Sequence, residues 1–134
     1  MITTEELIAK AASVIHAQQT KGGLIGDVGC ALLSQQWKIY TGVCADVWSN
    51  TFCAEKNAIG SMITDREYAI KKIVATWKDE SGNIFVIPPC GNCRQLMREI
   101  HEENLEETEV VLDKNKSVKL KDLLPYYDWR QKQA

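Results

Sequence analysis

Three cysteines in two short stretches constrain this chain more than any other feature of its sequence. Cys53 lies two residues before Glu55, and residues 89–93 read PCGNC, with Cys90 and Cys93 three positions apart. Thiolates bind zinc tetrahedrally, and a site with three protein ligands keeps its fourth position for water, as catalytic zinc sites do. Glu55 can stand beside that position without being a ligand, so it can carry the protons of the water. The pattern therefore predicts Cys53, Cys90 and Cys93 as Zn²⁺ ligands and Glu55 as the catalytic residue of a hydrolytic site.

Both ligand stretches are predicted to open a helix. Apolar residues recur at helical spacing after each of them, so the first helix should end near residues 63–64 and the second near His101. Cys90 and Cys93 then face the same way on one helical turn. The dipole at a helix N-terminus favours a thiolate, which suits both positions as metal ligands.

The alternatives are a closed structural zinc site and a chain without metal. A closed site needs a fourth protein ligand, and the remaining candidates are His16, Cys30, Cys44 and His101. None of these has ligand spacing to either cysteine stretch, so the open site is the favoured interpretation.

The remaining elements predict a layered α/β fold with one sheet between helices. Residues 3–19 are expected to form a helix, in which Thr3 and Glu6 make a capping box. Short apolar runs predict strands, which are 27–33, 37–44, 70–77, 109–112 and 117–120, with a further apolar approach over 84–87. A length of 134 residues suits a single domain, residues 1–134.

Composition excludes several function classes. The formal net charge of −2 leaves no electrostatic footprint for nucleic acid. We expect no membrane span and no secretory signal, because the chain has no long apolar run and no basic N-terminal region before one. With three of the five cysteines assigned to metal, the reducing cytoplasm is the expected compartment.

Two further segments are predicted to contribute to the site. Residues 44–50 are expected to form a loop that leads into the first zinc helix, so Asp46 and Trp48 are candidate substrate contacts, with plain loop roles as the alternative. The C-terminal aromatic residues, Tyr126, Tyr127 and Trp129, are expected to pack in this subunit or against a neighbour.

The paired C-x-E and P-C-x-x-C motifs match the signature of zinc deaminases. The chain as a whole resembles the small homotetrameric cytidine deaminases and the related blasticidin-S deaminases. The resemblance spans nearly the whole chain, and the segments that carry it are VGCAL at 28–32, YTGV at 40–43, CAE at 53–55, PCGNCRQ at 89–95 and DLLP at 122–125.

This resemblance implies a three-layer α/β/α fold with a mixed five-stranded sheet, and a homotetramer or dimer. It implies hydrolysis of an aminopyrimidine nucleoside to the oxo form, with release of ammonia. In that reaction Glu55 takes a proton from water, passes it to the ring nitrogen and then helps to protonate the leaving amine. The backbone of Ala54 meets the pyrimidine carbonyl. Trp129 is the match for a terminal aromatic residue that reaches the substrate of another subunit.

The substrate side departs from the pattern of these families. Cytidine deaminases hold the ribose with Asn and Glu two residues apart, and here those places are Cys44 and Asp46. Gly26 and Asp27 stand where the family has an aromatic residue near the base. The open alternatives are a modified nucleoside, an antibiotic nucleoside such as blasticidin S, a free base, and a non-catalytic zinc-stabilised protein.

The predicted metal site needs a nearby positive group, because three thiolates and one Zn²⁺ have a net charge of −1. The small cytidine deaminases place an arginine directly after the catalytic glutamate, where this chain has Lys56. Lys56 and Arg94 are therefore predicted to support the site electrostatically, with a solvated surface residue as the alternative for Lys56.

Overall fold

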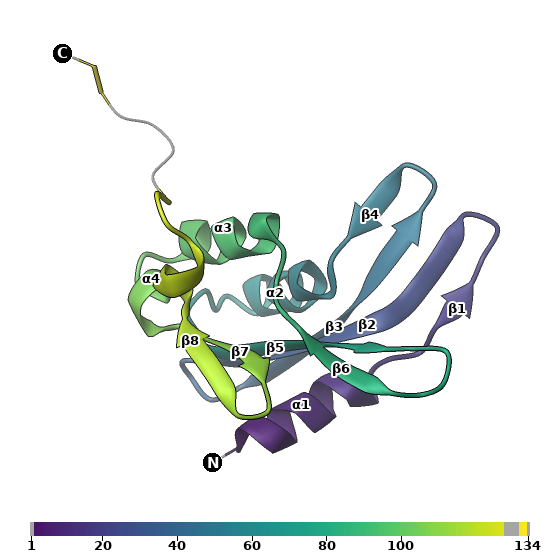
Figure 1. Ribbon diagram of the computed structural model, residues 1–134. Coiled ribbons are helices and arrows are strands. Elements are labelled where there is room, and N and C mark those ends of the chain that lie inside the picture. The colour runs from purple at the N-terminus through teal and green to yellow at the C-terminus, as the bar shows by residue number, and fades with distance from the viewer. Residues whose placement is uncertain (1, 128–131, 134) are drawn as a thin grey trace.

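The computed structural model describes residues 2–127 and 132–133 as one sheet with helices on both of its faces (Figure 1). The helices are α1 (Thr4–Ser13), α2 (Ala54–Thr64), α3 (Gly91–Ile100) and α4 (Asn104–Glu107), with a 3₁₀ turn η1 (Leu120–Leu123). The strands are β1 (Gln18–Gln19), β2 (Gly23–Ser34), β3 (Ile39–Val47), β4 (Asn50–Phe52), β5 (Ile70–Lys78), β6 (Ile84–Ile87), β7 (Glu109–Asp113) and β8 (Lys116–Lys119).

The sheet is mixed and has eight strands. Its main path runs β4-β3-β2-β5-β7-β8, with β1 paired to β2 and β6 paired to β5. Every pairing is antiparallel except that of β5 with β7, where Ile73 lies opposite Val110. The predicted layered α/β class is confirmed, but the number of five strands was too small. Strands as short as β1, β4 and β6 contain too few residues to show a periodic pattern.

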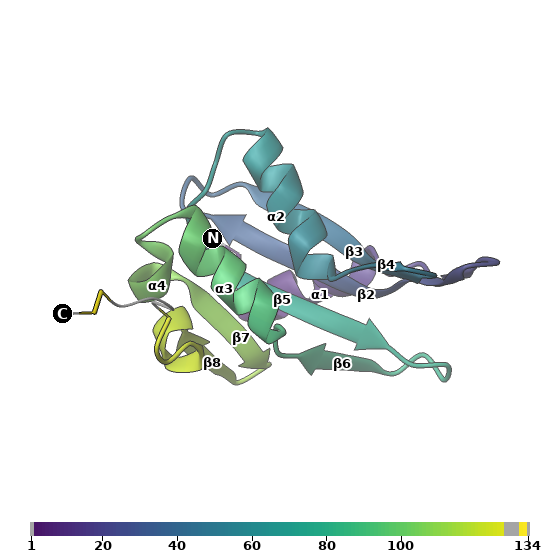
Figure 2. The ribbon, with the colours of Figure 1, turned by 90° about the horizontal axis from the view of Figure 1, so that it is seen from above.

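The hydrophobic core has two parts, one on each face of the sheet. Successive side chains of a strand point to opposite faces, so neighbours in sequence enter different layers. Cys30, Leu32, Ile73 and Val110 pack on one face with α2 and α3, in a cluster that includes Ile59, Met62 and Met97. Ala31, Val74 and Val111 pack on the other face with Leu7 and Ala11 of α1. Figure 2 shows α2 and α3 side by side on the face opposite α1.

A glycine in β3 lets α2 lie close to the sheet. A Cβ atom at Gly42 would stand 2.4 Å from the backbone nitrogen of Ala58 and 2.7 Å from Cβ of Asn57. No side chain fits at that separation, so Gly42 fixes how closely α2 approaches β3. The position of the N-terminus of α2 follows from this contact.

The N-terminal helix is shorter than the sequence predicts. α1 ends at Ser13, before residue 19, because Gln18 and Gln19 pair with β2. The capping box of Thr3 and Glu6 is confirmed.

The acidic stretch after α3 contains α4, which ties α3 to β5 through a buried asparagine. The Asn104 Oδ1 atom accepts a hydrogen bond of 2.8 Å from the backbone of Ile70, and its Nδ2 donates to the carbonyls of Met97 at 2.8 Å and Tyr68 at 3.0 Å. Sequence alone gave no sign of this, since an asparagine among glutamates looks like a solvated residue. None of the helices in the described residues is long and apolar enough to cross a membrane.

Candidate active site

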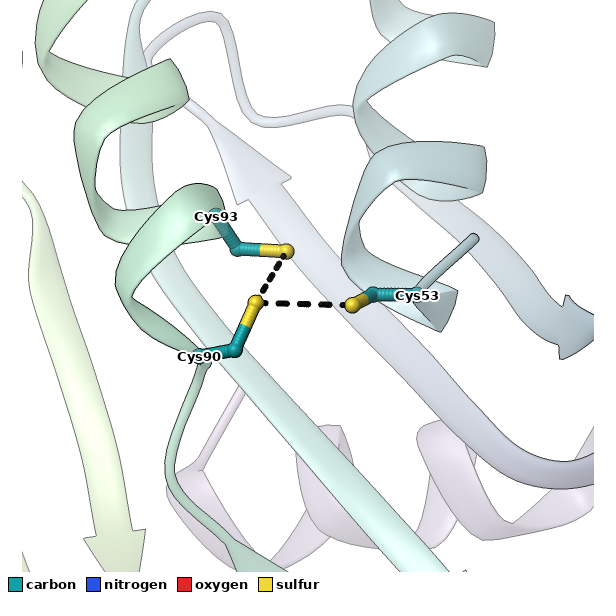
Figure 3. Close-up of side chains that lie close together, drawn as sticks. All are labelled: Cys53, Cys90 and Cys93. Carbon is teal, nitrogen blue, oxygen red and sulfur yellow. Dashed lines mark hydrogen bonds between the residues drawn. The ribbon is translucent and has the colours of Figure 1, made fainter. Parts of the chain in front are cut away.

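The N-termini of α2 and α3 meet at the three predicted metal ligands. Cys53 is the N-cap residue of α2, Cys90 is the N-cap residue of α3, and Cys93 lies in the first turn of α3. Neither N-cap side chain bonds to its own helix, so both thiols are available to a ligand. Figure 3 shows all three sulfur atoms turned toward one another. The two helix dipoles therefore point at the same spot, where they favour negative sulfur.

The spacing of the sulfur atoms fits one tetrahedral ion. The Sγ atom of Cys90 lies 3.5 Å from that of Cys53 and 3.5 Å from that of Cys93, and all three lie within 4.8 Å of one another. A Zn–S bond of about 2.3 Å in tetrahedral geometry places two sulfur atoms about 3.8 Å apart. Among the described residues, this is the only group of three or more His, Cys, Asp or Glu side chains that converges in this way.

The protein environment prepares the three thiols differently. Burial raises the pKa of Cys93 well above its ordinary value, with a further contribution from the nearby Glu55. Burial and the Cys90 thiol raise the pKa of Cys53. Burial also acts on Cys90, but the backbone N–H of Cys93 and the neighbouring thiols outweigh it, so the pKa of Cys90 falls below its ordinary value. A metal ion that binds here displaces thiol protons, so its affinity depends on pH.

Glu55 lies in the first turn of α2 and is 5% exposed. Burial raises the pKa of its carboxyl group, and its own backbone N–H lowers it only in part. Cys30 is fully buried, and its pKa is raised by burial and by the charge of Glu55.

A pocket of about 230 Å³ opens beside Glu55 and the sulfur cluster. Four residues predicted from the sequence line it together, and these are Cys44, Asp46, Ala54 and Glu55. The ligands Cys53 and Cys90 line it as well. Residues that were not singled out from the sequence complete the wall, namely Val28, Ala45, Thr51, Phe52, Ile87 and Pro88.

The predicted substrate contact Trp48 is not part of this wall. Trp48 sits at the turn between β3 and β4, where its side chain is among the most exposed, and its indole lies against Gly22. The expected loop over residues 44–50 is instead the end of β3 and the start of β4. Trp129 lies outside the described residues, so its contact with a neighbouring subunit stays a prediction.

Hydrogen bonds behind the pocket wall join three strands. The Cys44 thiol donates to Oδ1 of Asp27 at 3.1 Å, and the Trp77 indole donates to Oδ2 of the same carboxylate at 3.3 Å. Nearer the opening, the Thr51 hydroxyl donates to Oδ1 of Asp46 at 2.9 Å. The sequence marked Asp27 only as a departure from the family pattern and did not single out Thr51. Strand pairing brings both of them next to the wall residues Cys44 and Asp46. The two-residue spacing of Cys44 and Asp46 was a signal, since it places both on one face of β3.

The two predicted supporting cations occupy different environments. The Arg94 guanidinium donates to the carbonyls of Pro89 at 2.9 Å and Leu123 at 3.2 Å, which holds the start of α3 against the η1 turn. Lys56 is half-buried in α2 and makes no hydrogen bond or ion pair within the described part of the chain. Neither side chain lines the pocket. Their electrostatic role remains a prediction.

Solved structures of cytidine deaminases are similar to this fold. The enzyme from Mycobacterium tuberculosis is 22% identical with a TM-score of 0.70, over 93% of this chain and 96% of that one. The enzyme from Bacillus anthracis is 21% identical with a TM-score of 0.70, over 94% and 89%. The enzyme from Burkholderia pseudomallei is 25% identical with a TM-score of 0.69, over 92% and 98%. A comparison with curated proteins found no match.

The family model described as the cytidine and deoxycytidylate deaminase zinc-binding region matches residues 1–106. This range contains the three cysteines, Glu55 and every described wall residue of the pocket. It also covers most of the chain, so the protein belongs to the cytidine and deoxycytidylate deaminase family.

Proposed function

We propose that this protein is a zinc-dependent hydrolase that deaminates an aminopyrimidine nucleoside of the cytidine type and releases ammonia. One observation carries the proposal: a cluster of three thiols that fits zinc and a buried carboxylate, that of Glu55, border the same pocket. A purely structural metal site has no use for a buried carboxylate beside it, because burial of that group costs free energy.

Cys53, Cys90 and Cys93 would hold the zinc ion, and their spacing and chemistry fit it. When bound, zinc supplies the Lewis acidity that lowers the pKa of water to near neutrality. Three protein ligands leave room for that water on the pocket side, where Cys53 and Cys90 are part of the wall.

Glu55 is the group that moves protons. Its carboxylate takes the proton released by water, delivers it to the ring nitrogen of the pyrimidine and later helps to protonate the departing amine. Ala54 stands at the first position of α2, where a backbone N–H has no partner inside the helix. That N–H is free to donate to the carbonyl oxygen of the pyrimidine, which fixes the ring with its amine toward Glu55.

Several finer assignments belong to the same proposal. The small pocket suits a single nucleoside, so the partner is a small molecule. Five free cysteines, three of them proposed ligands, suit a reducing compartment such as the cytoplasm. We also propose one domain over residues 1–134 and a homotetramer, with Trp77 and Phe85 stacked on the exposed β5–β6 hairpin as candidates for the contact between subunits.

A second candidate is a modified or antibiotic nucleoside, or a free base, as the substrate. The observation in its favour is the pocket wall at Cys44 and Asp46, where the thiol of Cys44 donates to Asp27 and so has no proton left for a sugar hydroxyl. A non-catalytic zinc protein is the third candidate. It is disfavoured because a structural zinc site does not need the buried carboxylate of Glu55.

The test is a screen of amino-substituted nucleosides and free bases for ammonia release, with the metal content measured on the same sample. We expect about one zinc per chain and ammonia from at least one aminopyrimidine. A folded, freshly purified protein without metal would reject the proposed cofactor. A zinc-loaded protein that releases ammonia from no member of the panel would favour the non-catalytic candidate.

A further inference from the structure

The charged side chains among the described lining residues of the pocket are all carboxylates. Two carboxylates, Asp46 and Glu55, line it together with the ligands Cys53 and Cys90. Three thiolates around one divalent ion add a net charge of −1. No Lys, Arg or His side chain belongs to the described lining residues. An anionic substituent on a substrate would be repelled by these carboxylates, and no cationic side chain among the described lining residues contacts it.

The wall formed by β3 and β4 also offers acceptors rather than donors. Asp27 lies directly behind Cys44 and accepts the thiol proton at 3.1 Å, while Trp77 holds its second oxygen at 3.3 Å. Cys44 therefore presents only sulfur lone pairs to the pocket. Asp46 accepts one hydrogen bond, from the Thr51 hydroxyl, and among the described residues neither Asp27 nor Asp46 forms a salt bridge.

We propose that this wall makes Asp46 and Asp27 specificity-determining residues, and that the preferred substrate is an aminopyrimidine nucleoside whose sugar carries a positively charged amino group. The inference rests on the proposed deaminase function and names its substrate class. The reacting amine has to lie at the helix N-termini, beside Glu55 and the sulfur cluster. The sugar is then left for the wall of Cys44, Asp46 and Thr51. There an ammonium group meets the carboxylate of Asp46, with the charge of Asp27 behind Cys44, and a phosphate is repelled by the same charges.

Binding and turnover of a charge series test this inference. The probes are 3′-amino-3′-deoxycytidine and 5′-amino-5′-deoxycytidine, cytidine, and cytidine 5′-monophosphate, with Kd from calorimetry on the zinc-loaded protein and kcat/KM from ammonia release. We expect at least one amino nucleoside to bind about tenfold more tightly than cytidine, and the monophosphate about 100-fold more weakly, with both differences shrinking at high salt.

Variants of the two aspartates test which residue causes the preference for the amino nucleoside. Asp46→Asn should reduce the preference for the amino nucleoside over cytidine about tenfold, and Asp27→Asn, whose charge lies behind Cys44, should reduce it less. The matched control is Glu102→Gln, which removes one exposed charge beyond the far end of α3 and should leave the preference unchanged. Equal effects of all three variants would reject the assignment of Asp46 and Asp27.

The outcomes separate this inference from the function on which it rests. Ammonia release from cytidine, with Kd values equal across the series or lowest for the monophosphate, would overturn the charge selection and leave the deaminase standing. The expected order of Kd without ammonia release from any probe would support the selection and reject the proposed reaction. A protein that binds none of the probes would overturn both.

Discussion

Each end of α2 has a buried glutamate, and the surroundings shift the pKa values of the two carboxyl groups in opposite directions. Glu55 at the N-terminal end is 5% exposed and Glu67, just beyond the C-terminal end, is 6% exposed. Burial raises the pKa of Glu55, whereas the hydroxyl groups of Ser34 and Tyr40 hold the pKa of Glu67 below its ordinary value. Exposure alone therefore does not determine the state of either carboxyl group.

Hydrogen bonds account for the difference. Oε2 of Glu67 lies 2.6 Å from the Tyr40 hydroxyl and 3.5 Å from Nζ of Lys38, and the same two groups also hold Asp65. Glu55 accepts no hydrogen bond from another residue in the described part of the chain. A buried carboxylate with partners stabilises the fold, while one without partners is destabilising unless a ligand completes it. Only Oε2 of Glu67 has these partners, because its Oε1 is buried without one. We infer from the contrast that the N-terminal end of α2 is functional and the C-terminal end is structural.

The largest expected effect comes from removal of the carboxylate at the functional end. Glu55→Gln should keep the fold and the zinc but lose about 100- to 10,000-fold in kcat, because an amide cannot shuttle the proton. The free energy of unfolding should not fall, since a buried group without partners is replaced by a neutral one. Steady-state kinetics, metal analysis and urea denaturation check the three parts. A variant that turns over at the wild-type rate would show that Glu55 is not the proton carrier.

The same substitution at the structural end should give the reverse result. Glu67→Gln should lower the free energy of unfolding by about 1–3 kcal/mol, because charge-assisted hydrogen bonds to Tyr40 and Lys38 are weakened. Its kcat should stay close to the wild-type value. Denaturant titration and kinetics on the pair of variants measure the contrast directly, and a large loss of activity with unchanged stability in Glu67→Gln would break it.

Acid should remove the contribution of the structural end. Hydrogen bonds from Tyr40, with the charge of Lys38, lower the pKa of Asp65, and the pKa of Glu67 is lowered as well. Groups whose pKa is depressed on folding stabilise the protein above their unfolded pKa of about 4, and this stability is lost as the pH falls through the folded pKa. Tyr40→Phe should thus be less stable than wild type near pH 7, by an amount that shrinks toward pH 3. A difference in unfolding free energy that does not change with pH would contradict this origin.

The smallest effect is expected from Lys56 at the functional end. Lys56→Ala should keep the metal and shift the acidic limb of the pH–rate profile upward by less than about one pH unit, because a positive charge near three thiolates and Glu55 is lost. Lys78→Ala, an exposed lysine at the end of β5, is the matched control. Superimposable profiles for wild type and Lys56→Ala would assign Lys56 to the solvated surface.

Local spacing in the sequence determined the functional end of α2. Cys53 and Glu55 lie two residues apart and Cys90 and Cys93 three apart, so each pair is fixed by a single helical turn, which chain neighbours alone can specify. The helices from Ala54 and Gly91, the strands that carry the two cores and the capping box at Thr3 follow from short-range patterns of the same kind.

Tertiary structure decided the rest, because strand pairing joins residues that no local pattern connects. Asp27 reaches Cys44 across 17 positions and Trp77 across 50, and Tyr40 reaches Glu67 across 27. The sequence named Cys44, Asp46 and Asp27 but not the hydrogen bonds that they make, and it marked Glu55 through the C-x-E motif without showing that Glu67 is buried as well. Which of the two buried glutamates is stabilised and which is left for a ligand depends on a hydroxyl and an ammonium group that only the folded chain brings within 3.5 Å of the carboxylate.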